Sequence, residues 1–143
     1  QQQIDQDPKN VSLVNKLGVL YARYGVLDKA EDAFTKALAI QEYPPALINM
    51  GNIMRGKNNL PEARRYYERA FAKTPGDGAT LLNLAKITYE MGRFKETETY
   101  YGQLRKVDSL LADRFSYLGA GGDTGSARAA NAEAMKDEMV WGE

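Results

Sequence analysis

The sequence predicts an all-α fold, a solenoid in which antiparallel helix hairpins stack one after another. Apolar residues recur at helical spacing through residues 14–37, and Gly25 separates the two helical runs of this stretch. The same frame returns 33 residues later and again after a further 34, with breaks at Asn58–Asn59 and at Gly92. A fixed period of this length indicates a repeat protein, in which each hairpin buries its apolar side against its neighbours.

Small residues and aromatic rings return at fixed positions of the repeat. Small side chains at facing positions let the two backbones of a hairpin approach, and aromatic rings fill the space beside them. The small residues are Gly18, Gly51, Ala85, Ala30, Ala63 and Thr97, and the rings expected in the core are Tyr21, Phe34, Tyr67 and Tyr101. Tyr66 and Tyr100 lie one step farther round the helix, where we expect them to be half-exposed.

Caps and helix breakers predict where the helices begin and end. Asn10 is a suitable N-cap, Asp28 opens the second helix, and Asp77 can cap a later one. Pro44 and Pro61 suit the first turn of a helix, where a missing N–H needs no partner. Four helices are thereby expected at residues 10–24, 28–41, 78–91 and 94–107.

The last part of the chain departs from the repeat frame. Phe115 and Leu118 begin a fourth unit, but the glycine-rich stretch 119–125 follows, so we expect a first helix shortened by about one turn. A final helix over 126–141 would cap the stack with polar residues. The predicted division is a tail of a preceding repeat at 1–9, repeats at 10–43, 44–77 and 78–111, and a degenerate repeat with a capping helix at 112–143. A tag remnant or a polar tail is the alternative for residues 1–9.

These residues resemble the tetratricopeptide repeat family, whose repeat has two helices and a pattern of aromatic, Leu-Gly, Tyr, Ala, Phe and Pro. The first unit carries the pattern in LGVLY and KAEDAF, the second in EARRYYERA, and the third in LLNLAKI. The pattern is incomplete, because Thr88 and Thr97 stand where the family favours Tyr and Ala. The resemblance covers nearly the whole chain and implies a right-handed superhelical solenoid that binds protein partners and is not an enzyme.

Composition excludes several kinds of site. Nineteen basic and nineteen acidic residues give a net charge of zero, which argues against a nucleic-acid binder that relies on surplus Lys and Arg. The chain has no histidine and no cysteine, so most hydrolase constellations, thiol catalysis and Cys-ligated zinc are unavailable. No apolar run is long enough to span a bilayer, and we expect no cofactor, no metal and no direct membrane contact. These observations leave the cellular compartment open.

Two glycine motifs are better explained by the repeat than by a nucleotide. Gly51, Gly56 and Lys57 have the spacing of a phosphate-binding loop, but Asn58 replaces its Ser or Thr and no strand precedes it. The glycine-rich residues 119–125 also follow no predicted strand. A phosphate site is therefore not expected.

One stripe of the first helices is the predicted binding surface. In the resembling family this stripe lines a concave groove that holds a partner peptide, and here it combines an apolar floor with cationic and amide tips. Such a surface suits a segment with hydrophobic anchors and some acidic residues. The candidate groove residues are Asn15, Val19, Arg23, Ile48, Asn52, Arg55, Leu82, Lys86 and Tyr89. Some family members grip a C-terminal carboxylate, but Asn15 and Val19 replace the Lys and Asn of that clamp, which argues against it.

The sequence thus predicts a non-catalytic protein–protein interaction module with a protein or peptide partner. One alternative is a homo-oligomer or scaffold formed through the C-terminal helix, where Met135, Met139 and Trp141 are either an end seal or a contact for another copy or domain. Another is a regulatory domain of a larger polypeptide. A third possibility is that the groove charges are merely solvated and a convex face binds instead.

Overall fold

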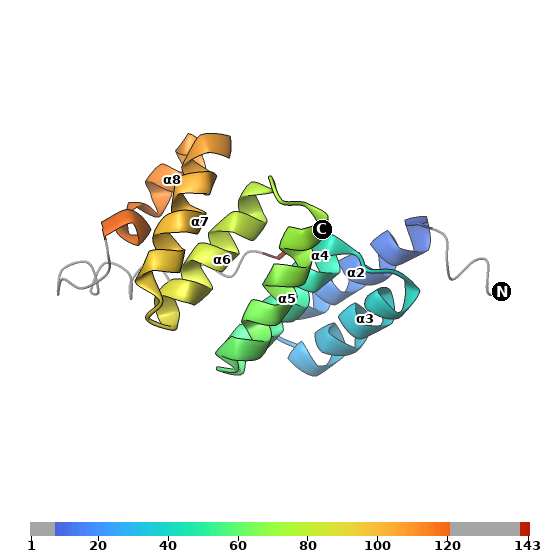
Figure 1. Ribbon diagram of the computed structural model, residues 1–143. Helices are drawn as coiled ribbons and strands as arrows, with labels where there is room; N and C mark the ends of the chain where they lie inside the picture. The colour runs from blue at the N-terminus through green and yellow to red at the C-terminus, as the bar shows by residue number, and fades with distance from the viewer. Residues whose placement is uncertain (1–7, 121–140) are drawn as a thin grey trace. The chain divides into compact units, whose positions relative to one another are not determined.

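The computed structural model describes residues 8–120 and 141–143, and these residues form helices and no strand (Figure 1). The elements are α2 (Pro8–Arg23), α3 (Leu27–Ile40), α4 (Pro44–Gly56), α5 (Leu60–Lys73), α6 (Gly78–Glu90), α7 (Phe94–Val107), α8 (Ser109–Arg114) and the 3₁₀ helix η1 (Ser116–Ala120). The prediction of an all-α chain of consecutive helix hairpins is confirmed. The chain divides into two compact units, residues 1–73 with 141–143 and residues 74–140.

The first unit consists of the hairpins α2–α3 and α4–α5, and α3 and α2 both pack against α4. Val11, Ala37 and Ala46 are fully buried where the three helices meet. Two ion pairs join the hairpins at the surface, with Lys57 Nζ 2.6 Å from Glu31 Oε1 and Arg69 Nη2 2.6 Å from Glu42 Oε1.

Glycine and an aromatic ring meet inside each of these hairpins. A Cβ atom built on Gly18 would lie 2.7 Å from Phe34 Cδ1, and one on Gly51 would lie 2.7 Å from Tyr67 Cδ1. Both rings are fully buried, so the prediction that they fill the space between close backbones is confirmed. Tyr21 was expected in the same core, but it is only half-buried, with Lys29 Nζ 5.7 Å from its ring centroid.

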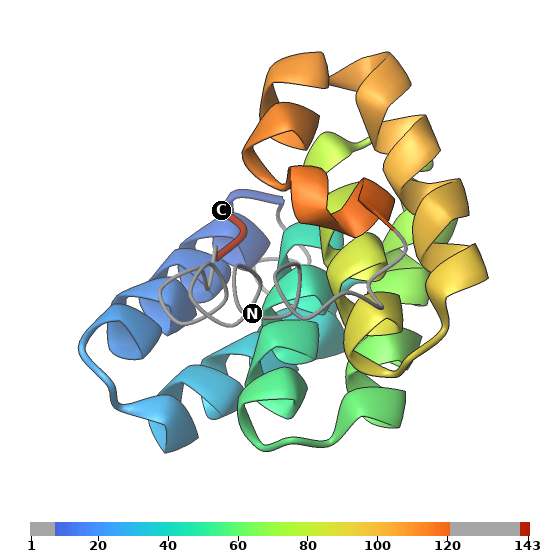
Figure 2. The same cartoon turned by 90° about the vertical axis from the view of Figure 1, so that its left-hand side faces the viewer.

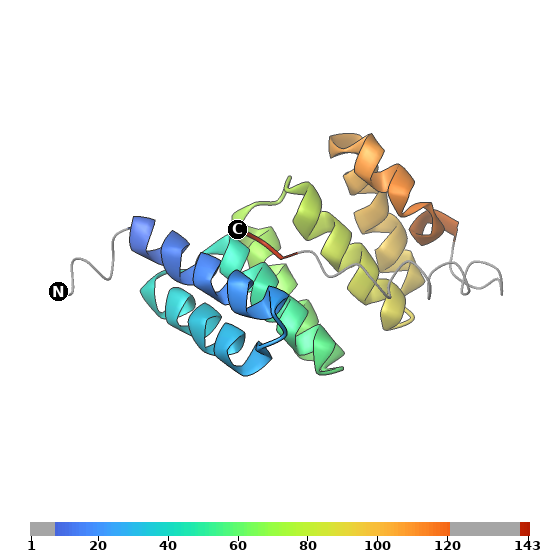
Figure 3. The same ribbon diagram turned by 180° about the vertical axis from the view of Figure 1, so that it is seen from behind.

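The second unit contains the hairpin α6–α7, against which α8 packs through α7 (Figure 3). Thr88 and Thr97 replace the Tyr and Ala of the repeat pattern and are buried with their hydroxyl oxygens 2.9 Å apart. The Thr88 hydroxyl is also 2.8 Å from the Leu84 carbonyl, so the departure from the pattern leaves no orphaned hydroxyl at this position. Tyr101 is buried, as expected, and its hydroxyl donates to the Ala112 carbonyl at 2.9 Å.

Most turns follow the sequence prediction. Pro44 and Pro45 occupy the first turn of α4, and Asp77 caps α6 by accepting from Thr80 N at 3.0 Å. Gly25 and Gly92 have φ angles of +78° and +77°, a backbone conformation that glycine adopts without steric cost.

Several limits predicted from the sequence are wrong. The first helix begins at Pro8, so Asn10 lies in its first turn and is not its N-cap. Val26 precedes α3 and makes no side-chain cap, which places Asp28 inside the first turn. The expected first helix of the fourth unit is two short pieces, because the chain ends α8 at Arg114 and continues as a 3₁₀ helix from Ser116.

The predicted final helix is only partly testable. Trp141, its last predicted residue, is not helical. Met135, Met139 and the rest of this predicted helix lie outside the described residues.

One face of α2 exposes large apolar side chains. Leu13, Leu17 and Leu20 recur every three or four residues and are therefore on one side of the helix, and Tyr24 follows directly after its end. Their exposed fractions run from 46% for Leu17 to 78% for Tyr24, whereas the equivalent position to Leu17 in the next repeat, Met50, is 4% exposed.

Candidate functional site

Residues 141–143 lie against the first unit, beside α2 and α4 (Figure 2). Their contacts come from α2, α3, α4 and the loop before α4. Two of the nine predicted groove residues, Asn15 and Arg23, contact this segment. The surface predicted to bind a partner is therefore occupied, in the first unit, by three residues of the same chain.

Two buried asparagines hold the main chain of Gly142. Asn49 Oδ1 accepts from Gly142 N at 2.5 Å, and Asn49 Nδ2 donates to Gly142 O at 2.7 Å. Asn15 Nδ2 donates to the same carbonyl at 3.1 Å. Asn49 Nδ2 also donates to Asn15 Oδ1 at 2.9 Å, which fixes the two amides relative to each other.

These contacts are made to the main chain of Gly142 and not to a side chain of the segment. Asn15 and Asn49 have no exposed surface, and a buried amide without a partner costs about 1–3 kcal/mol. The segment supplies partners for three of the polar atoms of this pair. The asparagine pair thus binds both main-chain polar groups of one residue, Gly142.

The side chains on either side of Gly142 contact different surfaces. The Trp141 ring stacks on Phe34 with centroids 6.1 Å apart and an interplanar angle of 20°. Glu143 Oε2 lies 2.8 Å from Arg23 Nη2, and the Glu143 main-chain oxygen accepts from Tyr43 Oη at 3.3 Å. The Arg23 and Glu143 side chains are 61% and 48% exposed, so their ion pair contributes no more than about 1 kcal/mol. The ring contact and the amide pair dominate.

The other predicted groove residues of the first unit form the surface around this contact. Val19 and Ile48 are buried, as an apolar floor requires. Asn52 is also buried, and its Oδ1 accepts from the Tyr67 hydroxyl at 2.5 Å, so this amide is engaged in the core of its hairpin. Arg55 is partly exposed near the end of α4.

In the second unit the predicted groove residues are more buried than expected. Leu82 and Lys86 line a recess of about 120 Å³ between α6 and α8, together with Asn83. Lys86 is only 2% exposed, and its Nζ lies 5.0 Å from the Phe115 ring centroid. Tyr89 packs edge-on against Phe94 and Tyr117, with centroids 5.4 and 5.3 Å away.

Comparisons with known proteins agree with this geometry. The family model described as tetratricopeptide repeat matches residues 44–77, which span α4 and α5. The chain also superimposes on the first TPR of Spaghetti (RPAP3), solved bound to the HSP90 peptide SRMEEVD, with a TM-score of 0.68 over 91% of this chain and 94% of that one. Residues 44–77 match a tetratricopeptide repeat, and the chain has the helix-hairpin fold of such repeats. Sequence identity to that structure is 13%, so the likeness concerns the fold.

Three curated relatives contain a similar tetratricopeptide stretch. They are tetratricopeptide repeat protein 8 of Mus musculus, 24% identical over 73% of this chain, protein O-mannosyl-transferase TMTC1 of Homo sapiens, 28% over 71%, and BBSome complex member BBS4 of Bos taurus, 25% over 70%. The matched region is 20%, 12% and 19% of these relatives, so the chain spans a fifth of their length or less. Tetratricopeptide repeats form protein-interaction scaffolds, and this chain is an interaction module of that kind.

Asn49 contacts residues 141–143 but is not among the groove residues predicted from the sequence. The repeat frame aligned Asn15 with Ile48, so Asn49, one residue on, was not selected. A signal was present, since Asn83 stands 34 residues after Asn49 in an otherwise apolar helix and is also buried. An amide that recurs at the repeat period on a buried face indicates a role beyond packing.

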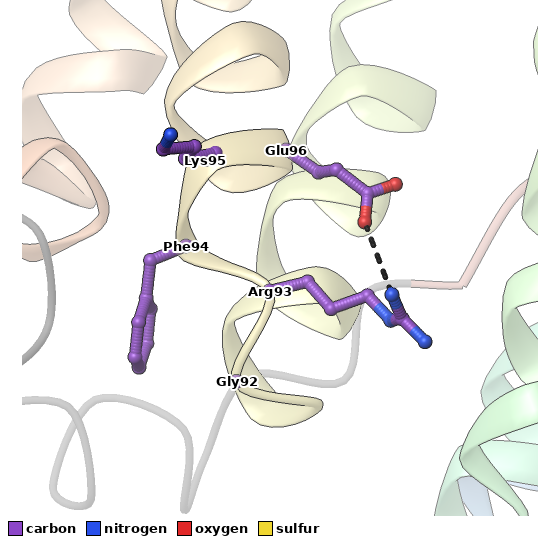
Figure 4. A pocket seen from close by; sticks show the side chains of 5 residues that line it. All are labelled: Gly92, Arg93, Phe94, Lys95 and Glu96. Atoms are coloured by element: carbon purple, nitrogen blue, oxygen red, sulfur yellow. Dashed lines mark ion pairs between the residues drawn. The ribbon is translucent and has the colours of Figure 1, made fainter.

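A surface recess of about 310 Å³ lies at the turn between α6 and α7 (Figure 4). Arg93 and Glu96 face each other across 3.9 Å, and Phe94 points away from them. Both charged side chains are more than a third exposed, and no buried polar group is directed into the recess from the residues that line it. It is a weak candidate for a ligand site.

Within residues 8–120 and 141–143, no cluster of acidic side chains could hold a metal ion. No helix in this described part is long and apolar enough to cross a membrane.

Proposed function

We propose that this protein binds an extended segment of a partner protein on the groove face of its first helices. It acts through this binding and not through catalysis. The main support is the asparagine pair Asn15–Asn49, which already holds one residue of a chain segment by both its N–H and its C=O. The similar TPR structure was solved with a peptide bound, which makes the same use of this fold reasonable here.

The chemistry of the face suggests what such a segment contains. Val19 and Ile48 offer apolar contact, while Arg23 and Arg55 bring positive charge near the C-terminal ends of α2 and α4. We therefore expect partner segments with apolar or aromatic anchors beside acidic residues.

Catalysis is not part of this proposal. The chain lacks histidine and cysteine, the residues that most often serve as bases and nucleophiles at neutral pH. One relative is named a transferase, but the match covers 12% of that protein, so the name carries no activity to this stretch.

The proposal can be tested without knowing the partner. Random peptides displayed on phage are selected on the purified chain, and the enriched peptides are measured again on Asn49→Ala and on Gln103→Ala, which removes an exposed amide of α7. We expect binding to be lost at least 10-fold on Asn49→Ala and retained on Gln103→Ala. Peptides that bind the parent and Asn49→Ala equally would show that the groove face of the first unit is not the binding surface.

Arg55→Glu is the second variant for this test. Lys86→Glu, which the sequence alone would suggest beside it, is unsuitable because Lys86 is buried against Phe115 and a buried carboxylate there would damage the fold. Arg55 is partly exposed, so its reversal tests charge without opening the core.

A further inference from the structure

The groove of the first unit is filled by Trp141, Gly142 and Glu143, and each of the three contacts a surface of different chemistry. We propose that this site reads the sequence pattern aromatic–glycine–acid, and that residues 141–143 of the same chain are its resident ligand, which a partner must displace. This inference rests on the groove function proposed above and adds to it the chemical class of the ligand.

The aromatic position is set by Phe34. Its ring is fully buried and lies over Gly18, where a Cβ atom would be 2.7 Å from Cδ1. Trp141 stacks on this ring at 6.1 Å and nearly parallel to it. An aliphatic side chain at this position has no flat face to stack, so the site favours an aromatic residue.

The glycine position is set by the backbone of α4. A Cβ atom on Gly142 would lie 3.1 Å from the Pro45 carbonyl oxygen and 3.2 Å from Pro45 Cα. Both atoms belong to the first turn of a helix and cannot move aside as a flexible side chain would. A bulky residue therefore cannot sit here while its N–H and C=O both reach Asn49, at 2.5 and 2.7 Å.

The acidic position is set by Arg23, whose Nη2 lies 2.8 Å from Glu143 Oε2. Because this ion pair is solvent-exposed, it favours an acidic residue at this position but supplies only a small part of the binding free energy. The order of importance is thus main chain and glycine first, the ring second and the acid third.

A ligand in the same chain competes with any partner. Linking a segment to its site within one chain gives effective concentrations in the millimolar range, so a linked segment of moderate affinity occupies its site most of the time. Freeing the site should raise the apparent affinity for an external segment by about 10- to 100-fold, which is the reciprocal of the fraction of time for which the occupied site is open.

The test uses a fluorescein-labelled peptide with the sequence of residues 137–143, DEMVWGE, amidated at its C-terminus so that no free carboxylate contributes. Its anisotropy is titrated with the parent chain, with Trp141→Ala, and with Trp141→Ala carrying either Asn49→Ala or the control Gln103→Ala. We expect Trp141→Ala to bind at least 10-fold tighter than the parent, Asn49→Ala to abolish this gain, and Gln103→Ala to keep it.

Substitutions in the peptide provide a control that does not depend on the folding of a protein variant. A peptide with valine in place of its glycine leaves the protein untouched, and we expect it to bind at least 10-fold more weakly to Trp141→Ala. Trp141 is the only tryptophan, so an unlabelled peptide with phenylalanine in place of tryptophan should shift the parent's emission to longer wavelength as Trp141 is displaced.

Two results would overturn the proposal: equal affinity for the parent and Trp141→Ala, or equal binding of the glycine and valine peptides. The two levels of the proposal fail separately. If the labelled peptide does not bind to Trp141→Ala while displayed peptides still bind through Asn49, the aromatic–glycine–acid pattern is wrong and the proposed groove function stands. If Trp141→Ala also yields no displayed peptide that depends on Asn49, the groove function falls with it.

Discussion

Single residues show most directly why this chain folds as it does. Gly18 and Gly51 are helical glycines, which on helix propensity alone would each be worse than alanine by about 1 kcal/mol. They are tolerated because the Phe34 and Tyr67 rings occupy the volume that a Cβ atom would need. The packing of the hairpin therefore overrides the local preference of the helix.

A pair of glycine substitutions separates these two effects. Gly51→Ala should destabilise the protein by about 1–3 kcal/mol, because the new methyl group overlaps the Tyr67 ring. Gly102→Ala, in α7, meets nothing within 4 Å and should stabilise by up to about 1 kcal/mol. Urea denaturation followed by circular dichroism measures both, and a stabilised Gly51→Ala would show that the ring has room to move.

One ion pair predicts a dependence of stability on pH. Hydrogen bonds from the Arg69 guanidinium, at 2.9 and 2.6 Å, lower the pKa of Glu42 below its ordinary 4.5. A carboxyl group with a lowered pKa stabilises the folded state above its unfolded pKa, and this contribution is lost as pH falls through the folded value. Since the Arg69 and Glu42 side chains are 46% and 38% exposed, it should not exceed about 1 kcal/mol.

A double-mutant cycle with Glu42→Gln and Arg69→Gln isolates this contribution. We expect a favourable coupling energy at neutral pH that disappears in acid, below the lowered pKa of Glu42. Coupling that is unchanged by acid would mean that the contact is packing rather than charge.

The candidate site could be predicted in part from the sequence. Asn15 and Arg23 were identified because they lie on the stripe beside the packing face, and both contact residues 141–143. Asn49 was missed because a shift of 33 residues aligns Asn15 with Ile48, whereas Asn49 lies 34 residues after Asn15. The occupant itself could not be predicted, since the hydrogen bond between Asn49 and Gly142 joins residues 93 positions apart and no local pattern encodes it.

At the scale of helices, caps and turns determine where each element begins. Asp77 accepts from both the N–H and the hydroxyl of Thr80, at 3.0 and 2.8 Å, and so satisfies a free donor at the start of α6. Asp28 lies in the first turn of α3, where no side-chain cap is formed. Two aspartates that look equivalent in the sequence therefore act differently.

Replacing each aspartate by alanine tests this difference. Asp77→Ala should cost about 0.5–2 kcal/mol through loss of the cap. Asp28→Ala should cost less, about 0.3–1 kcal/mol, because it removes no cap but only the favourable interaction with the helix dipole and an attraction to Lys57. Thermal melting measures both, and a larger loss for Asp28→Ala would contradict the assignment of the caps.

The first and last residues of a helix were predictable where the residue beside them clearly turns the chain or ends the helix. The predicted helix over 94–107 matches α7 at both ends, because Gly92 turns the chain before it and Asp108 breaks the helix after it. The prediction failed after Asp108, whose side chain caps α8 by accepting from Leu111 N at 3.0 Å. That cap starts a helix earlier than the hydrophobic pattern does, and the helix then ends before Phe115.

At the scale of the whole molecule, the two units carry different versions of the same surface. The first unit presents Asn15 and Asn49 to a main chain, while the second buries Asn83 beside Lys86 in a recess of about 120 Å³. The first unit therefore carries the better-defined candidate site for a chain segment, because among the described residues only there are the N–H and the C=O of one residue both matched.

The mass of the protein in solution distinguishes partner binding from self-assembly. The assembly alternative drawn from the sequence uses Trp141 as a contact between copies, but in the structure this ring stacks on Phe34 of its own chain. We therefore expect the mass measured by light scattering to be the same for Trp141→Ala and the parent at every concentration. Leu17→Ser is the matched comparison, since it removes an exposed apolar side chain from α2, where self-association through a hydrophobic face would occur. The contrary outcome is a parent protein that associates, with Trp141→Ala monomeric and Leu17→Ser still associated. That result would place Trp141 between copies and support the assembly alternative over an intramolecular ligand.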